Sequence, residues 1–118
     1  MIRLPSGYGR AVKAGGMIYV SAMGPIDLES GQVVGLGIEE QARQCMKNLK
    51  ARLEKEGSSL EQVVWANWSL RDASEFDLFN EEWLRWYPDD APVGQCTLLP
   101  PVQRRAGFRI SIGVIAQA

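Results

Sequence analysis

The 118 residues are 46% hydrophobic and 23% charged, which is ordinary for a soluble globular protein, and this length predicts one domain spanning residues 1–118. A net charge of −1 excludes the basic surface of a nucleic-acid-binding protein, and no apolar run approaches the ~20 residues of a membrane span. The absence of histidine excludes a Ser-His-Asp triad and a histidine zinc site. With no signal-peptide pattern and no CxxC pair, we expect two reduced thiols and a cytoplasmic protein.

The chain opens with the pattern of a β-hairpin. Residues 8–14 and 17–23 are apolar segments, and Gly15-Gly16 between them suits a two-residue turn because glycine readily adopts positive φ. Gly24-Pro25 ends the second segment. Residues 32–35 then predict a short strand or an extended piece of chain.

Two helices are expected farther along. The first, over residues 38–56, carries an apolar stripe at spacings of three, four and seven: Ala42, Cys45, Met46, Leu49 and Leu53. Asp72 and Glu75 form a capping box that opens a second helix over residues 73–87, which Pro88 ends. A further capping box, Ser58 with Glu61, predicts a short helical turn between the two helices.

Three more strands complete the pattern. Residues 63–70 are rich in β-branched and aromatic side chains, residues 94–98 are a shorter candidate, and residues 107–116 alternate apolar with polar positions. Pro100-Pro101 breaks the chain, and Arg104-Arg105 is expected in a loop. On the second helix, Glu81 and Glu82 fall on the side expected to face solvent.

This order of elements predicts an α+β protein with both helices on one face of a mixed sheet. The strand over residues 63–70 carries Trp65 and Trp68 among large or apolar neighbours, so we expect both of its faces to be buried. Its second face therefore needs a cover that the helices do not supply. Association of identical chains is one way to provide it. The tryptophan pair could stack an aromatic ligand or provide core and interface packing.

The stretch from Ala91 to Thr97 stands out because it follows a helix and precedes the final alternating strand. Together with other short motifs it forms an ordered set. The set comprises Tyr8, residues 14–21, Gly24-Pro25, residues 38–44, residues 57–61, Asp72, Asn80, Ala91-Pro92, Cys96 and residues 110–116.

This ordered set runs without large gaps over nearly the whole chain and resembles the Rid/YjgF superfamily, the RidA-like enamine and imine deaminases. The resemblance implies a chorismate-mutase-like α+β fold. It also implies a homotrimer whose sheets form a central barrel, with small-molecule ligands in the clefts between subunits. It implies no metal or organic cofactor.

Two charged groups of the deaminases are replaced in this sequence. The resemblance places a substrate-clamping arginine at Gly94, where a guanidinium would hold a carboxylate through two hydrogen bonds. It places a water-orienting glutamate at Ser111. Both replacements are small and uncharged, so fold and activity have to be argued separately.

The resemblance assigns site roles to a small group of positions. Ser111 and Tyr8 are the candidate catalytic residues, because they could hold the water and the substrate. The candidate ligand-binding residues are Ser21, Gly94, Gln95 and Cys96, to which we add Arg10 from its strand position two residues after Tyr8. We expect Gly94 to offer a bare amide and extra room for a bulkier ligand, and Cys96 to line the site rather than act as a nucleophile.

Each candidate has an alternative interpretation. Tyr8 could pack at an interface, Ser111 could be a polar strand position, and Cys96 could be a buried small hydrophobe. Arg10 shares a strand face with Tyr8 and could replace the missing clamp, or it could be a solvated surface residue. Arg109, two positions before Ser111, is the other candidate clamp.

Two functions follow from these observations. The first is hydrolysis of an enamine or imine, with release of ammonia, on a substrate other than the usual small 2-imino acids. The alternative is a non-catalytic trimer that binds a small metabolite. A third, ribonuclease activity, is disfavoured by the net charge of −1 and the absence of histidine.

Overall fold

The computed structural model describes residues 9–118. Its strands are β1 (Ala11–Ala14), β2 (Met17–Met23), β3 (Val63–Leu70), β4 (Val93–Leu98) and β5 (Ile110–Gln117). Its helices are α1 (Ile38–Lys55), α2 (Phe76–Trp86) and α3 (Pro101–Arg105), and short 3₁₀ turns at Leu60–Gln62 and Ala73–Glu75 precede β3 and α2.

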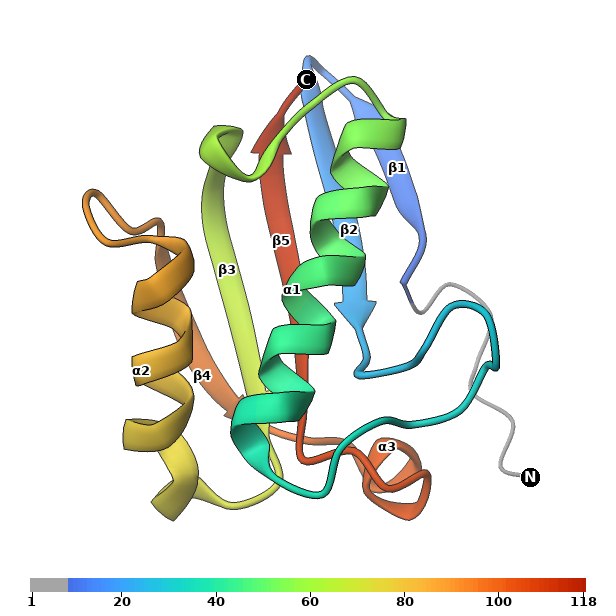
Figure 1. Ribbon diagram of the computed structural model, residues 1–118. Coiled ribbons are helices and arrows are strands. Elements are labelled where there is room, and N and C mark those ends of the chain that lie inside the picture. The colour runs from blue at the N-terminus through green and yellow to red at the C-terminus, as the bar shows by residue number, and fades with distance from the viewer. Residues whose placement is uncertain (1–8) are drawn as a thin grey trace.

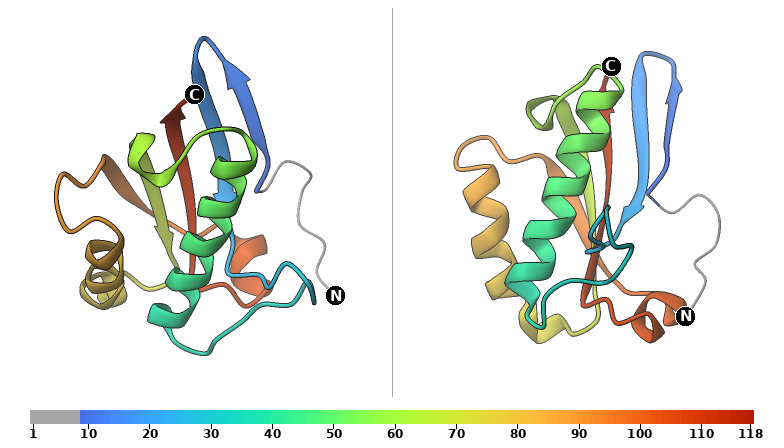
Figure 2. Two further views of the ribbon diagram at one scale, coloured as in Figure 1. Left: turned by 45° about the horizontal axis from the view of Figure 1, so that its top comes forward. Right: turned by 45° about the vertical axis from the view of Figure 1, so that its right-hand side comes forward.

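The five strands form one mixed sheet in the order β1-β2-β5-β3-β4. Only β3 and β4 run parallel, because α2 carries the chain back to the starting end of β3. Helices α1 and α2 lie on one face of this sheet (Figure 1), and the turned views place both helices on that same side (Figure 2). The expected α+β arrangement, with two helices on one face of a mixed sheet, is confirmed.

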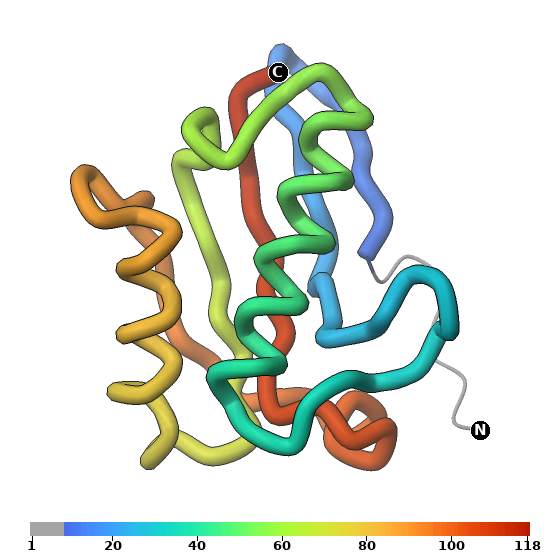
Figure 3. The backbone as a smooth tube through the Cα atoms, in the orientation of Figure 1, coloured from blue at the N-terminus to red at the C-terminus, as the bar shows by residue number. Residues whose placement is uncertain are grey.

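The hairpin forms as the sequence predicts. β1 and β2 pair antiparallel through Gly15 and Gly16, whose φ angles of 59° and 79° require residues without a Cβ. Residues 32–35 form the extended piece rather than a strand of the sheet. Val33 bridges Ile26, and backbone hydrogen bonds join Gln32 to Asp27 and Val34 to Pro25. The segment between β2 and α1 lies beside the sheet (Figure 3).

Helix α1 buries its predicted stripe against the sheet, with Cys45, Leu49 and Leu53 fully enclosed. Its facing partners are the even-numbered residues of β5, from Ile110 to Ala116. The predicted capping box at Ser58 is wrong by one residue. Ser59 takes the N-cap position without a side-chain capping bond, and its hydroxyl donates to the Gln62 side chain. The Ser58 hydroxyl donates to the Gln117 carbonyl and ties the turn to β5.

The Asp72 carboxylate accepts a hydrogen bond from the Ser74 backbone N–H and caps the 3₁₀ turn Ala73–Glu75, so α2 begins at Phe76, later than predicted. The predicted capping box is wrong in its second half, because the Glu75 carboxylate pairs with Arg109. The helix packs Phe79 and Trp83 onto Trp68 of β3, with ring centroids 5.8 and 5.2 Å from the Trp68 ring. These rings form a continuous aromatic layer between α2 and the sheet.

Glu82 is not solvated, contrary to expectation, whereas Glu81 is exposed. The Glu82 carboxylate accepts hydrogen bonds from Arg43 of α1 at 3.0 Å and from the Trp86 indole at 2.9 Å. Arg85 adds an ion pair at 3.4 Å. Glu82 therefore links the two helices.

The opposite face of the sheet carries no helix in the part of the chain that the structure describes. Val12 and Tyr19 are 63% and 44% exposed there, and Trp65 and Ile115 are half-buried beside them. Trp65 lies on this face, whereas Trp68 packs against Phe79 and Trp83 of α2 on the other, so the two indoles do not stack on one ligand. We call this uncovered apolar surface the open face.

Candidate functional site

The stretch that stands out in the sequence forms β4, an edge strand. Its register with β3 sets Gly94 beside Ala66, Gln95 beside Asn67 and Cys96 beside Trp68. Because strand side chains alternate, Gly94 and Cys96 share the side of Trp68, under α2, and Gln95 points to the open face. The three candidate residues of β4 therefore divide between the two faces of the sheet.

Gly94 has no spare room beside it, so the expected space for a bulkier ligand is wrong. A Cβ built on Gly94 would overlap the backbone carbonyl oxygen of Ala66 and would lie 3.2 Å from the Trp68 ring. The Trp68 indole N–H is buried without a hydrogen-bond partner among the described residues. Backbone and indole together occupy the place where a side chain would start.

Cys96 is exposed on β4, so it is not the buried hydrophobe of the alternative interpretation. Partial burial raises the pKa of its thiol above the usual value, which keeps the sulfur protonated at neutral pH. The buried Cys45 thiol has a pKa raised far more strongly by the same cause. Neither thiol has the environment of an activated nucleophile.

Ser111 lies buried on β5, directly beside Ser69 of β3. Its hydroxyl donates to the side-chain carbonyl of Gln103 on α3 at 2.9 Å. The sequence gave no sign of this partner, because residues 101–105 were expected to form a loop rather than a helix. Ser111 is therefore engaged within the subunit, and it has no carboxylate with which to act as a base.

Arg10 and Ser21 come together on the open face. The Ser21 backbone N–H donates to the Arg10 carbonyl at 2.9 Å, and both residues are exposed. A hollow of about 610 Å³ lies across the sheet here, and its lining includes Arg10, Val12, Tyr19, Ser21, Trp65 and Asn67. The hollow thus combines one cation, small polar groups and an aromatic floor.

The remaining candidates separate from this group. Tyr8 lies outside the described residues. Arg109 donates from its Nε to the Leu36 carbonyl at 2.8 Å and pairs with Glu75 at 3.1 Å, so its guanidinium is engaged in holding the loop before α1 to the start of α2. Of the two candidate clamps, only Arg10 faces open space.

Within one subunit, the predicted residues do not form one pocket. Arg10 directly precedes β1 and Ser21 lies on β2, whereas Gly94 and Cys96 lie on β4 at the opposite edge of the sheet. Ser111 lies buried between these positions. A site that uses both edges would need a second copy of the chain.

Sequence reasoning also missed two buried amides that shape this end of the fold. Gln41 donates to the carbonyls of Gly35 and Gly107 and accepts from the Arg109 backbone N–H. Asn48 donates to the carbonyls of Gly24 and Ile26. Polar residues on the buried side of α1 were the available signal.

Among residues 9–118, no group of three His, Cys, Asp or Glu side chains is close enough to hold a metal ion. In the same range, no helix has both the length and the apolar character needed to span a bilayer.

Comparison with known proteins assigns the class. Residues 2–118 match the family described as Endoribonuclease L-PSP. The chain belongs to this family, which is part of the Rid/YjgF superfamily. The resemblance drawn from the sequence is thereby confirmed.

Individual relatives agree with this assignment. The chain is 36% identical over 110 residues to the RutC family protein SSO3206 of Saccharolobus solfataricus, covering 93% of this chain and 86% of that one. It is 31% identical over 109 residues to the mouse 2-iminobutanoate/2-iminopropanoate deaminase, covering 92% and 79%. The crystal structure of RidA from the Antarctic bacterium Psychrobacter sp. PAMC 21119 superposes with a TM-score of 0.84 at 30% identity, covering 98% of this chain and 92% of that one.

Proposed function

We propose that this chain hydrolyses the C=N bond of an enamine-derived or imine substrate, and that the substrate is not one of the small 2-imino acids. Family membership and the mouse relative named as a deaminase support the reaction class. The observation that carries the restriction on substrate is the closed surface at Gly94, where the Ala66 carbonyl and the Trp68 ring leave no place for a clamping side chain.

The reaction needs little from the protein beyond positioning. Water adds to the imine carbon, the nitrogen takes up protons, and the C–N bond of the resulting carbinolamine breaks to give a carbonyl product and ammonia. Ordered donors around the reacting atoms can accelerate such a step without a strong base. Ser21 and the backbone of Gly94 to Cys96 are the groups assigned to this positioning, and Arg10 is assigned to an anionic part of the substrate.

The active unit in this proposal is a homotrimer with ligand clefts between subunits. Two observations support it: the open face is apolar and uncovered, and Arg10 and Ser21 lie far across the sheet from Gly94 and Cys96. Val12 and Tyr19 would be buried on association. Light scattering at micromolar concentration is expected to give three times the chain mass for the wild type, and a smaller assembly for Tyr19→Asp. A monomeric wild type would contradict this part of the proposal.

Ammonia release tests the activity. Freshly generated 2-iminopropanoate and a larger muconate-type imine would be supplied to the wild type, to Arg10→Ala and to Cys96→Ala, with Tyr8→Phe to test the tyrosine. We expect turnover of the larger imine, a loss of about tenfold in kcat/KM for Arg10→Ala, and a change below about threefold for Cys96→Ala because backbone groups act there. Lys47→Ala, an exposed change on α1, is the control.

A second candidate function is non-catalytic binding of a small metabolite. It is favoured by Ser111, whose hydroxyl is buried and already donates to Gln103, so that no base stands at that position. Failure to release ammonia from any imine, together with tight binding of a carboxylate metabolite, would favour this candidate over hydrolysis.

A further inference from the structure

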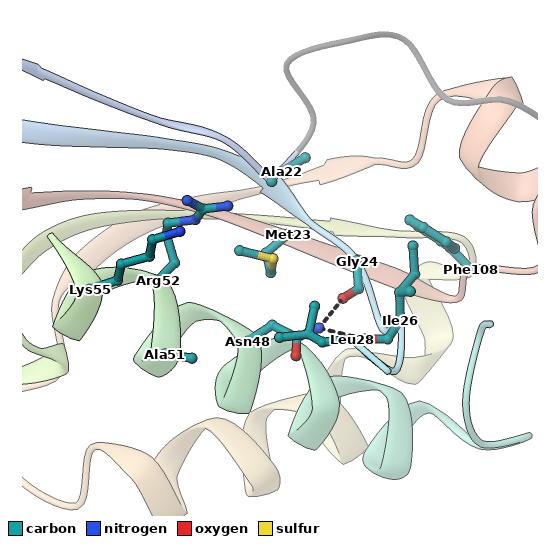
Figure 4. Close-up of a pocket in the computed structure, with 11 residues that line it drawn as sticks. Ala22, Met23, Gly24, Ile26, Leu28, Asn48, Ala51, Arg52, Lys55 and Phe108 are labelled. Atoms are coloured by element: carbon teal, nitrogen blue, oxygen red, sulfur yellow. Dashed lines mark hydrogen bonds between the residues drawn. The ribbon is translucent and has the colours of Figure 1, made fainter. Parts of the chain in front are cut away.

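A second cavity lies on the helix side of the sheet, away from the candidate residues on β4 and β5. It adjoins the hollow of the open face through Ala22, which lines both. It has a volume of about 360 Å³ and lies between the end of β2, the loop that follows it, and the C-terminal half of α1 (Figure 4). This volume falls within the range of small-molecule sites in proteins, about 300–1,000 Å³. The proposed reaction makes no use of it.

The apolar wall of this cavity is held in place by the fold. The Asn48 side chain donates to the carbonyls of Gly24 and Ile26 at 3.1 and 2.8 Å and fixes the loop to α1 (Figure 4). Phe108 packs so closely on Gly24 that a Cβ there would overlap its ring. Met23 and Phe108 therefore form a preformed apolar surface rather than a gap that side chains could close.

The rim of the cavity is cationic. Arg52 and Lys55 lie three positions apart on α1, so they share one face of the helix, and both extend toward β2 (Figure 4). None of the lining residues is an Asp or Glu. Among the described residues, neither cation forms a salt bridge, whereas Arg43, Lys50, Arg85 and Arg109 all do.

We infer that this cavity binds an amphiphilic carboxylate, with an apolar body against Met23 and Phe108 and its carboxylate between Arg52 and Lys55. A guanidinium pairs with a carboxylate through two parallel hydrogen bonds, and the neighbouring ammonium adds a second charge. A neutral ligand would leave Arg52 and Lys55 without a counter-charge. A small anion would leave the apolar surface of Met23 and Phe108 exposed to water. The combination of the two features selects the class of ligand.

Titration of the full chain with 4-phenylbutanoate tests the inference, with 4-phenylbutan-1-ol and acetate as matched probes. NMR of methionine labelled at the methyl carbon reports the place of binding, because Met23 lines the cavity and Met17 and Met46 do not. We expect a saturable shift of the Met23 signal with 4-phenylbutanoate, and at least tenfold weaker binding of the alcohol and of acetate. Equal binding of acid and alcohol would overturn the inference, as would a shift confined to Met17.

Variants of Arg52 distinguish the loss of its positive charge from a general loss of folding. Arg52→Ala is expected to weaken 4-phenylbutanoate about tenfold, the lower end for hydrogen bonds to charged groups, because this rim is open to water. Arg52→Lys should retain part of the affinity, and Lys47→Ala, an exposed cation of α1 outside the cavity, should leave it unchanged. Unchanged affinity in Arg52→Ala would refute the site. Ammonia release should be unaffected by this variant, so the inference and the proposed reaction fail independently.

Discussion

Adjacent glutamates on α2 offer a direct test of how the two helices are joined. Glu82 is 3% exposed and accepts hydrogen bonds from Arg43 and from the Trp86 indole, whereas Glu81 is exposed. Replacing Glu82 by alanine leaves the indole N–H without its acceptor and separates α1 from α2 at this point. The same replacement at Glu81 removes nothing that the structure uses.

The expected loss of unfolding free energy in Glu82→Ala depends on which hydrogen-bond partners of Glu82 can be hydrated once the carboxylate is gone. Arg43 and Arg85 are 40% and 65% exposed, so they rehydrate and do not incur the full penalty of a broken buried pair. The Trp86 indole is only partly buried, so its N–H is incompletely hydrated once the acceptor is gone. The lost acceptor together with the lost packing sets the cost at about 2 kcal/mol of unfolding free energy. For a chain of this size this corresponds to a fall of about 8 °C in Tm.

Urea and thermal unfolding followed by circular dichroism would measure these values, at one protein concentration for all variants because association shifts apparent stability. Glu82→Gln keeps an acceptor for the indole and should cost only about 1 kcal/mol. Glu81→Ala should stay within about 0.5 kcal/mol of the wild type. If Glu82→Ala and Glu81→Ala unfold alike, the buried carboxylate does not join the helices and the reasoning is wrong.

Three further predictions rest on local geometry. Gly94→Ala forces a Cβ onto a backbone carbonyl of β3 and should lose about 2 kcal/mol of stability by urea unfolding, whereas Gly37→Ala, with open space around it, should lose less than half of that. Iodoacetamide should alkylate Cys96 in the folded protein and should spare Cys45 until the protein unfolds. The pH midpoint of Cys96 alkylation should lie above that of a cysteine peptide, because burial raises the pKa of this thiol. Equal alkylation rates for the two thiols would contradict this. Burial also raises the pKa of Tyr87, so the neutral phenol is favoured in the folded state and stability should fall as pH rises above about 10; a Tyr87→Phe variant with the same alkaline slope would rule this out.

The periodicity of the sequence was enough to locate the regular elements. β2, β3 and α1 lie where the alternating and helical patterns predict them, because each buries one apolar face and the pattern records that face directly. The short α3 was missed because its five residues begin at the second of two prolines and carry no apolar period. Of the two alternatives for residues 32–35 the structure has the extended piece, because Val33 alone forms a bridge and no strand of the sheet in the described part of the chain lies beside it.

The candidate site was less predictable, because it depends on contacts between distant segments. Arg10 and Ser21 do share a face, as their strand positions imply. The engagement of Ser111 by Gln103 and of Arg109 by Glu75 could not be read from the sequence, since each pair joins different elements. Neither partner stands out by residue type alone.

By itself, the sequence determined the class of fold and the family. It also gave the expectation, drawn from the resemblance, that Gly94 and Ser111 stand where the deaminases carry charged groups. These are properties of residue order and of local period. Only the tertiary structure decided that Gly94 leaves no room, since that depends on how closely β4 approaches the Ala66 carbonyl and the Trp68 ring. It also decided that Arg52 and Lys55 meet an apolar cavity. Side-chain surroundings arise from packing across the chain, and packing is not encoded at any single position.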